Sequence, residues 1–195
     1  MEPRRVSVVE GRSLAECIDV VSRALNPWNA YYAKSAVESG VASFATLLID
    51  GVPRGCSVFY TLDTDPIVGV VYYIAIDPPL WGRGLGKVLL ASTEELLELR
   101  GSRLFVATTR EDNVASRALF SSMNYAEKRL DELYAESPRA AENLVRALCS
   151  FEDDVVMYRG AGLKTLLKAF ERCGRVCRDV WYRICYIPWA RSRFF

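Results

Sequence analysis

Apolar and polar residues alternate with two different periods along this chain of 195 residues. Period-two alternation or a short apolar run predicts strands over residues 5–9, 41–49, 54–61, 66–76, 102–109, 125–133 and 154–158. Amphipathic spacing predicts helices that begin after Ser13 and that cover residues 27–39, 87–99, 114–123 and 139–148. Hairpins come first and strand–helix units follow. This order predicts an α/β fold with a mixed, mostly antiparallel central sheet and helices on both faces.

Two local signals sharpen the pattern. Ser13 is followed three residues later by Glu16, which predicts a capping box at the start of the first helix. Asp50-Gly51 stands between two apolar runs and predicts a tight hairpin turn.

The composition, with 51% apolar and 25% charged residues, is that of an ordinary globular protein. No stretch approaches the roughly 20 uncharged apolar residues of a membrane-spanning helix. The first residues lead into a strand-like run and not into the apolar core of a signal peptide. We therefore expect a cytoplasmic protein.

Histidine is absent, which excludes histidine-based triads, imidazole bases and nearly all catalytic zinc sites. No C-x-x-C pair is present, so a structural zinc site has little support and we expect no metal. In a cytoplasmic chain we expect free cysteines, buried as small hydrophobic residues. These cysteines are Cys17, Cys56, Cys149, Cys173, Cys177 and Cys185.

The net charge of +1 hides an asymmetry along the chain. Residues 1–159 carry 17 basic and 22 acidic side chains, whereas residues 160–195 carry eight basic and two acidic ones. We predict a domain over residues 1–159 and a basic, amphipathic helical extension over residues 160–195.

Within that extension, apolar residues recur at helical spacing from 161 to 187, and Pro188 is expected to end the helix. We expect the helix to dock on the domain or on a second copy of the chain, as in a homo-oligomer. Its charge leaves a membrane surface, or an acidic partner such as RNA, as less favoured alternatives. Cys173 and Cys177 share one helical face, where they could pair between chains.

The most informative segment is a glycine-rich turn. An apolar strand ending at Ile76 leads into Gly82, Gly84 and Gly86, and a helix begins at once. Glycines let a ligand approach the backbone, and the helix start offers unpaired N–H groups. This combination is suited to a phosphate or pyrophosphate site, but a bare G-x-G-x-G turn taken by itself favours a plain connector between strand and helix.

Two nucleotide-binding patterns do not fit this turn. A Walker A loop needs a hydroxyl residue after Gly86-Lys87, and Val88 stands there. A dinucleotide fingerprint would follow the first strand of a βαβ unit, whereas several antiparallel-looking strands precede this turn.

A family resemblance fits better. Residues 81–86 (WGRGLG) resemble the acetyl-CoA-binding motif Q/R-x-x-G-x-G/A of the GNAT N-acetyltransferases. Residues 113–125 (NVASRALFSSMNY) resemble the family pattern N-x-x-A-x-x-L-Y-x-x-x-G-F, with Asn124 at the glycine place as a left-handed helix cap. Residues 153–157 (DDVVM) are similar to its closing strand. The resemblance spans residues 4–159 and implies the GNAT fold.

The resemblance implies acetyl-CoA as acetyl donor, held mostly by the backbone. The main chain of residues 74–76 would pair with the pantetheine amides, and N–H groups of residues 82–87 would cradle the pyrophosphate. Asn113 and Ser116 would contact the pantetheine arm, and Phe120 would lie beside the thioester. The implied cofactor-binding residues are Ile74, Ala75, Ile76, Gly82, Arg83, Gly84, Leu85, Gly86, Lys87, Asn113, Ser116 and Phe120.

The chain departs from the family at its acid and base. Phe120 stands where a tyrosine often protonates the thiolate, and Thr108 stands at the fifth-strand place of the glutamate base. Trp81 replaces the usual Gln or Arg. Candidate substitutes, each with a structural role as the alternative, are Tyr72, Tyr73 and Tyr134, with Glu111 and Asp112 beside Asn113.

The resemblance places the acceptor against the first two helices and the sixth strand. Aromatic side chains with a few carboxylates there suit a cationic amine or a peptide N-terminus, and equally an apolar core. The residues concerned are Trp28, Asn29, Tyr31, Tyr32, Tyr125, Glu127 and Tyr134.

These observations together predict an acetyl-CoA-dependent N-acetyltransferase. It would move an acetyl group to a primary amine, on a small molecule or a protein N-terminus, by direct attack in a ternary complex. The alternative is a non-catalytic acyl-CoA-binding module with a partner-binding basic tail.

Overall fold

A computed structural model describes residues 5–192. Seven strands form one sheet in the order β1-β2-β3-β4-β5-β7-β6. Their bounds are Val6–Glu10 (β1), Ser43–Ile49 (β2), Val52–Leu62 (β3), Val68–Ile76 (β4), Leu104–Thr109 (β5), Ala126–Arg129 (β6) and Val155–Arg159 (β7). Strands β4 and β5 pair in parallel, whereas β1–β2, β2–β3, β5–β7 and β6–β7 are antiparallel. The predicted α/β class with a mixed, mostly antiparallel sheet is confirmed.

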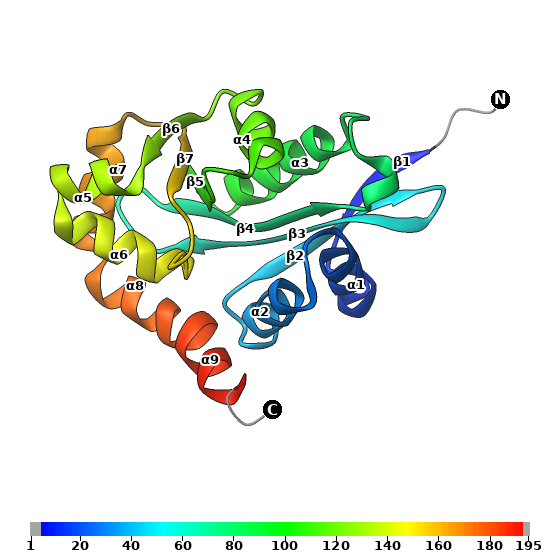
Figure 1. The fold of residues 1–195 in the computed structure, drawn as a ribbon, viewed down its shortest axis with the longest axis horizontal. Coiled ribbons are helices and arrows are strands. Elements are labelled where there is room, and N and C mark those ends of the chain that lie inside the picture. Colours follow the sequence, from blue (N-terminus) through cyan, green and yellow to red (C-terminus); the bar gives the residue numbers. More distant parts are fainter. Residues whose placement is uncertain (1–4, 193–195) are drawn as a thin grey trace. The chain divides into compact units, whose positions relative to one another are not determined.

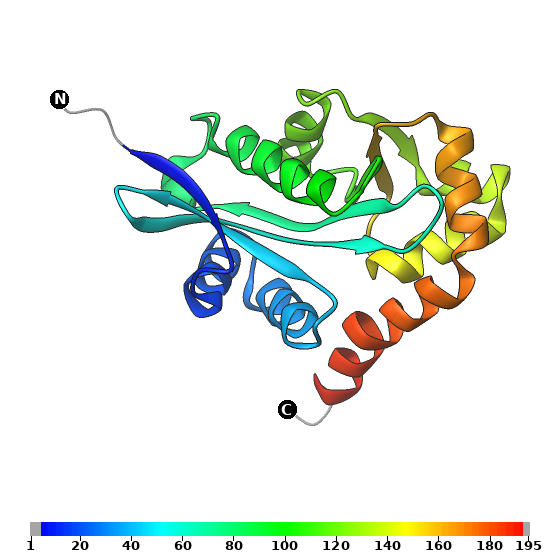
Figure 2. The same cartoon turned by 180° about the vertical axis from the view of Figure 1, so that it is seen from behind.

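The chain divides into two units, residues 1–60 with 71–96 and residues 61–70 with 97–195. In the first unit, helices α1 (Leu14–Ala24) and α2 (Pro27–Glu38) cover one face of the strands, and α3 (Leu85–Leu99) covers the other, as Figures 1 and 2 show. Cys17, Val20, Leu47, Phe59 and Leu89 lie in its core, each without exposed surface. The apolar faces of strands and helices meet there, as their spacing predicts.

The hairpin signal is confirmed and the capping box is wrong. Asp50 and Gly51 both take positive φ, 51° and 79°, which a tight two-residue turn requires. Ser13 precedes α1 with φ 46° and ψ 87°, and its side chain makes no capping hydrogen bond. An N-cap hydroxyl reaches the helix N–H groups from an extended backbone, and this left-handed backbone points it elsewhere.

The second unit holds β5, β7 and β6, and before the C-terminal extension it holds the helices α4 (Val114–Ser121), α5 (Leu130–Glu136) and α6 (Pro138–Leu148). The strand predicted over residues 125–133 is wrong beyond Arg129, because α5 begins at Leu130. Leu130 and Leu133 are buried at helical spacing, and Asp131 adds a negative charge to the first turn. Asn124 has φ 62°, which confirms the left-handed cap after α4.

The C-terminal extension is helical but is not one helix. It comprises α7 (Leu163–Arg172), α8 (Gly174–Trp181), a π-helical turn (Tyr182–Tyr186) and α9 (Ile187–Ser192). Pro188 lies inside α9 and does not stop it, which corrects the prediction. Ile187 N–H bonds to the oxygen of Tyr182, five residues back, so the widened turn carries the chain past a proline that lacks an N–H.

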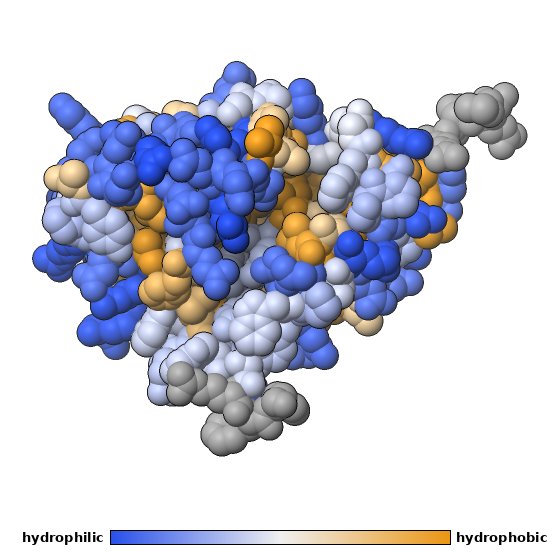
Figure 3. All heavy atoms as spheres, viewed as in Figure 1, coloured by the Kyte–Doolittle hydropathy of each residue, from blue (hydrophilic) through white to orange (hydrophobic). Residues whose placement is uncertain are grey.

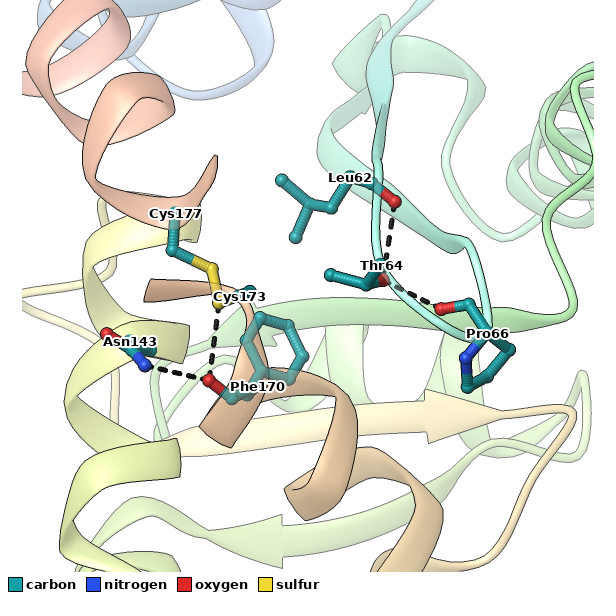
Figure 4. The surroundings of a disulfide bond; sticks show 7 residues. All are labelled: Leu62, Thr64, Pro66, Asn143, Phe170, Cys173 and Cys177. Carbon is teal, nitrogen blue, oxygen red and sulfur yellow. Dashed lines mark hydrogen bonds between the residues drawn. A yellow bond between two sulfur atoms is a disulfide. The ribbon is translucent and has the colours of Figure 1, made fainter. Parts of the chain in front are cut away.

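The extension packs on α6. Phe170, Cys177 and Ile184 are buried, and α7 and α8 both lie against α6. The side-chain Nδ2 of Asn143 on α6 donates a 2.8 Å hydrogen bond to the oxygen of Phe170 on α7 (Figure 4). Docking on the body of the chain is thus confirmed, while the division at residues 159 and 160 stays a prediction.

The expectation of free cysteines is wrong. Three disulfides join Cys17 to Cys56, Cys149 to Cys185, and Cys173 to Cys177, the last drawn in Figure 4. The fold brings each pair to Cα–Cα distances of 5.0–5.5 Å, within the usual range for a disulfide. The cysteines of the first two pairs are 39 and 36 residues apart, so local sequence spacing does not predict these disulfides. Within residues 5–192, no helix is long and apolar enough to cross a membrane.

Candidate active site

The glycine turn follows directly on β4, and a small apolar cluster anchors it. Ile76 at the end of β4 packs with Leu47 and Leu89, and Leu80 and Leu85 from the turn lie against this cluster. The helix starts at Leu85, two residues before its predicted position, and a 3₁₀ turn over Pro78–Leu80 precedes it. The turn is thus held at both ends while its centre stays exposed.

The centre of the turn is an open backbone cradle. Gly82 and Gly84 take φ 75° and 76°, and a Cβ added at either residue would meet nothing within 4 Å. Among the hydrogen bonds of the described residues, none is donated by the main-chain N–H groups of residues 82–86. The positive end of the α3 dipole lies at this point. Open space and unbonded N–H groups at a helix start fit a pyrophosphate.

Arg83 and Lys87 have exposed side chains on this turn. Ala75 and Ile76 are buried, and Ile74 is half-buried. The structure therefore gathers the predicted residues 74–87 in one continuous strand–turn–helix segment.

An ion cluster that the sequence analysis missed fixes the end of β4. Asp77, with only 4% of its side chain exposed, contacts Arg23 at 2.8 Å and Arg54 at 3.0 Å. Burial acts to raise the pKa of Asp77, but hydrogen bonds and charges from the two arginines outweigh burial and hold the pKa below its usual value. The cluster ties α1 and β3 to the residue that opens the turn. A carboxylate directly after an apolar strand was the signal available in the sequence.

Trp81, which replaces the family's Gln or Arg, bonds back to β4. Its Nε1 donates a 2.7 Å hydrogen bond to the main-chain oxygen of Ile76. The ring remains 60% exposed. The main-chain oxygen of Ile76 therefore already accepts one hydrogen bond from the protein. The family resemblance implies that this strand also pairs with pantetheine.

The candidate catalytic tyrosines lie in two places. Tyr72 and Tyr73 are neighbours on β4 with ring centroids 4.5 Å apart, and Tyr72 lies 5.8 Å from the ring of buried Tyr60. Burial, followed by the nearby tyrosines, raises the pKa of Tyr72 well above its ordinary value, so its hydroxyl stays protonated. Tyr134 lies on α5 in the second unit and is 41% exposed. Tyr72 and Tyr73 are thus neighbours in the first unit, and Tyr134 belongs to the second.

Helix α4 carries the predicted Asn113, Ser116 and Phe120. The Asn113 side chain caps the helix by accepting a 3.1 Å hydrogen bond from the N–H of Ser116. Both residues have solvent-accessible surface, whereas Phe120 is buried against Tyr125 with ring centroids 4.9 Å apart. Asn113 therefore has a structural role beside the expected one.

Ion pairs surround the start of α4 and continue along β6. Arg117 bonds to both carboxylate oxygens of Glu127, at 2.9 and 2.8 Å, and Lys128 pairs with Glu132 and Glu136. Figure 3 shows a mostly hydrophilic surface over β6. Across residues 5–192, no three His, Cys, Asp or Glu side chains gather as metal ligands would.

Comparisons with known proteins agree with this architecture. A crystal structure of a GNAT-family acetyltransferase from Desulfovibrio desulfuricans superposes with a TM-score of 0.61 at 19% identity, over 80% of this chain and 99% of that one. The ribosomal-protein-S18-alanine N-acetyltransferase of Escherichia coli gives a TM-score of 0.55 at 22% identity, over 83% and 97%. At these identities the likeness shows the fold.

Sequence matches are shorter. The mycothiol acetyltransferase of Nocardia farcinica is 36% identical over 73 residues, which is 37% of this chain and 24% of that protein. The match thus covers about a quarter of that curated relative. Residues 16–125, more than half of the 195, match the model of the acetyltransferase (GNAT) family. The chain therefore belongs to the GNAT family of acetyltransferases, for which acetyl-CoA is the acetyl donor.

Proposed function

We propose that this protein is an N-acetyltransferase that moves the acetyl group of acetyl-CoA to a primary amine by direct attack in a ternary complex. The single observation that carries the proposal is the cradle at residues 82–86, with open space at two left-handed glycines and unbonded N–H groups at a helix start. Family membership supplies the reaction class. When bound, acetyl-CoA supplies the thioester carbon that the amine attacks.

The cofactor part of the proposal names residues in each unit. In the first, the unbonded N–H groups of residues 82–86 bind the pyrophosphate, and the side chains of Arg83 and Lys87 add charge. The N–H of Lys87, also expected from the sequence, already bonds to the oxygen of Gly84 at 3.0 Å. The main chain of Ile74 and Ala75 pairs with pantetheine, and Ile76 takes part through the oxygen that it shares with Trp81. In the second, Asn113, Ser116 and Phe120 on α4 contribute contacts to pantetheine and the thioester.

The acceptor side of the proposal rests on aromatic residues of the first unit. Trp28, Tyr31 and Tyr32 on α2 form a cluster with ring centroids 5.3–5.8 Å apart, and Tyr32 is close enough to Tyr72 to influence its ionisation. Aromatic faces attract ammonium groups, which suits a cationic amine. The relatives are named for mycothiol and for an alanine of ribosomal protein S18, so their names favour no single acceptor class.

Calorimetric titration with acetyl-CoA, CoA and ATP tests the cofactor part. We expect micromolar binding of the two CoA ligands and none of ATP, lost in Gly84→Val. Gly11→Val is a matched control, because Gly11 also has a positive φ (72°) and open space but lies away from the turn. Equal binding by wild type and Gly84→Val would contradict the cradle.

The alternative, a non-catalytic acyl-CoA-binding module, is favoured by one feature of the C-terminal helices. An exposed stripe at helical spacing combines arginines with aromatic residues whose rings lie near one another, the type of surface that binds partners. It comprises Arg175, Arg178, Tyr182, Tyr186 and Trp189. A panel of amines that elicits no CoA release from a protein that binds acetyl-CoA would favour this alternative.

We propose a cytoplasmic location as well. Three disulfides are unusual there, except in intracellular proteins of hyperthermophiles. The absence of glutamine, a thermolabile residue, agrees with such a source.

A further inference from the structure

The C-terminal helices have one buried side and one exposed side. Along α8, the π-helical turn and α9, the buried side includes Cys177 and Ile184, and α8 lies against α6. The exposed stripe described above, from Arg175 to Trp189, lies on the other side, because its members follow one another by three or four residues. The Cys149–Cys185 disulfide joins the π-helical turn to the end of α6. The buried side is therefore fixed, and the stripe is the side that faces solvent.

Cationic side chains gather on these helices in excess of acidic ones. Residues 160–192 hold seven basic and two acidic side chains. Both carboxylates are engaged, because Glu171 accepts a 2.7 Å hydrogen bond from the Ser137 hydroxyl and Asp179 pairs with Arg183 at 3.8 Å. Within the described chain, no ion pair reaches the other six basic side chains, which are all exposed: Lys164, Lys168, Arg172, Arg175, Arg178 and Arg191. A row of cations without acidic partners attracts a polyanion.

Aromatic rings continue the stripe beyond the arginines. Tyr182, Tyr186 and Trp189 are 49%, 40% and 41% exposed. The rings of Tyr182 and Tyr186 stack with centroids 5.5 Å apart and planes 19° apart, and the ring of Trp189 lies 5.9 Å from that of Tyr186. The rings hold one another in place, so their outer faces are flat surfaces on which an aromatic ring of a partner can stack.

The exposed apolar residues indicate the kind of polyanion. Among residues 163–192, no leucine, isoleucine, valine or phenylalanine is exposed, and the large exposed hydrophobic side chains are all aromatic. An amphipathic helix enters a bilayer with its apolar face, and here that face is packed on α6. A second copy of the chain would bring two basic surfaces together. Single-stranded nucleic acid meets both features of the stripe, because arginine pairs with phosphate and unpaired bases stack on tyrosine and tryptophan.

We propose that the exposed stripe, together with the cations of α7 beside it, binds single-stranded RNA. Arg172, Arg175 and Arg178 contact phosphates, and bases stack on the aromatic end of the stripe. A single strand exposes the faces of its bases, whereas a duplex stacks them on one another. Every base has a flat face, so the binding is tolerant of sequence. The inference does not depend on acetyl transfer and holds for an enzyme as for a binding module.

Fluorescence anisotropy of the full chain with a labelled oligouridine of about 12 nucleotides, without reductant, tests the charges. Three phosphate contacts predict that the affinity falls about 20-fold from roughly 50 to 200 mM NaCl. Arg175→Ala/Arg178→Ala should bind more weakly and lose only about threefold over that range, since one phosphate contact remains. Arg12→Ala/Arg103→Ala removes the same charge from exposed positions outside the extension and should match wild type.

A strand without bases tests the rings. An abasic sugar-phosphate strand of the same length keeps the charge of the oligouridine, and wild type should bind it about 100-fold more weakly, the equivalent of about fivefold for each of three stacked bases. Tyr182→Leu keeps an apolar side chain but removes the ring, so it should lose about fivefold in affinity for oligouridine and none for the abasic strand. Tyr182→Phe keeps the ring and should bind like wild type. An unchanged midpoint of urea denaturation checks that each variant is folded.

Three outcomes would overturn the proposal. Failure of oligouridine to bind the full chain at low salt removes the site. Undiminished binding by Arg175→Ala/Arg178→Ala places the RNA on another surface. Equal affinity of wild type for oligouridine and the abasic strand shows that charge alone explains the binding, and cosedimentation with phosphatidylserine vesicles that persists in Tyr182→Leu would then assign the surface to a membrane. None of these results bears on acetyl transfer, so the proposed function stands or falls separately.

Discussion

The indole Nε1 of Trp81 donates a 2.7 Å hydrogen bond to the main-chain oxygen of Ile76, and this bond closes the glycine turn onto the end of β4. At this motif position, where the family usually has Gln or Arg, the side chain therefore contacts the protein's own strand. Since the cradle at residues 82–86 begins one residue later, the bond fixes where its N–H groups point.

Trp81→Phe should weaken acetyl-CoA binding about five- to tenfold, the equivalent of one hydrogen bond of about 1 kcal/mol. The variant keeps an aromatic side chain but loses the N–H and one ring of the indole, so the loss reports on the hydrogen bond together with a smaller contact area. Calorimetric titration measures the dissociation constant. Trp189→Phe, a comparably exposed tryptophan on α9, serves as control and should bind like wild type. Unchanged affinity of Trp81→Phe would show that the turn keeps its shape without this bond.

Asp77 gives a prediction on stability. Asp77→Asn keeps the shape but loses the charge that Arg23 and Arg54 share, and should lower the free energy of unfolding by about 2 kcal/mol at pH 7. Urea denaturation measures this change. Asp19→Asn on exposed α1 surface should cost much less.

The comparison of wild type with Asp77→Asn also predicts how the free energy of unfolding depends on pH. The folded-state pKa of Asp77 lies below its unfolded value of about 3.9, so its stabilising contribution is complete above that pH. It is lost as the pH falls through the folded-state pKa. The difference between wild type and Asp77→Asn should therefore be constant from pH 5 to 8 and shrink only in stronger acid. A difference that shrinks near pH 7 would contradict the ion cluster.

Two features predicted correctly, the hairpin turn and the cap after α4, have signals that are local. Asp50-Gly51 specifies its turn by its own backbone preferences, and Asn124 caps α4 in the same way. The carboxylate after β4 is visible in the sequence, but its partners could not be predicted, because Arg23 and Arg54 are 54 and 23 residues away from Asp77 and meet it only in the folded chain. The prediction that Pro188 ends the helix is wrong because a π-helical turn, which sequence propensities do not predict, accommodates the proline.

The disulfides differ in the lengths of the loops that they close, and this difference gives a prediction on stability. Cys17–Cys56 spans 39 residues and Cys173–Cys177 spans four. In the chain-entropy account, the longer loop stabilises by about 4 kcal/mol and the short one by about 2 kcal/mol. Cys17→Ala/Cys56→Ala should therefore lower the unfolding midpoint more than Cys173→Ala/Cys177→Ala. The denatured, unreduced wild type should show no reactive thiol, and six titratable thiols would refute the pairing.

Tyr72 provides a prediction on the acid that protonates the departing thiolate. Its hydroxyl lies beside Tyr73 and near Tyr60, and its raised pKa keeps it protonated well into the alkaline range. A protonated phenol can donate to a departing thiolate but cannot act as a base. If Tyr72 has this role, Tyr72→Phe should lower kcat about 10- to 100-fold without changing the affinity for acetyl-CoA, measured by CoA release and by titration. Tyr182→Phe, in the exposed C-terminal extension, should match wild type.

In the wild type, the alkaline limb of the pH profile of kcat should lie above pH 10, because deprotonation of Tyr72 is displaced upward from the ordinary tyrosine value of about 10. A Tyr72→Phe variant with full turnover would assign the hydroxyl to packing with its neighbours, and the thiolate would then leave without an acid from β4.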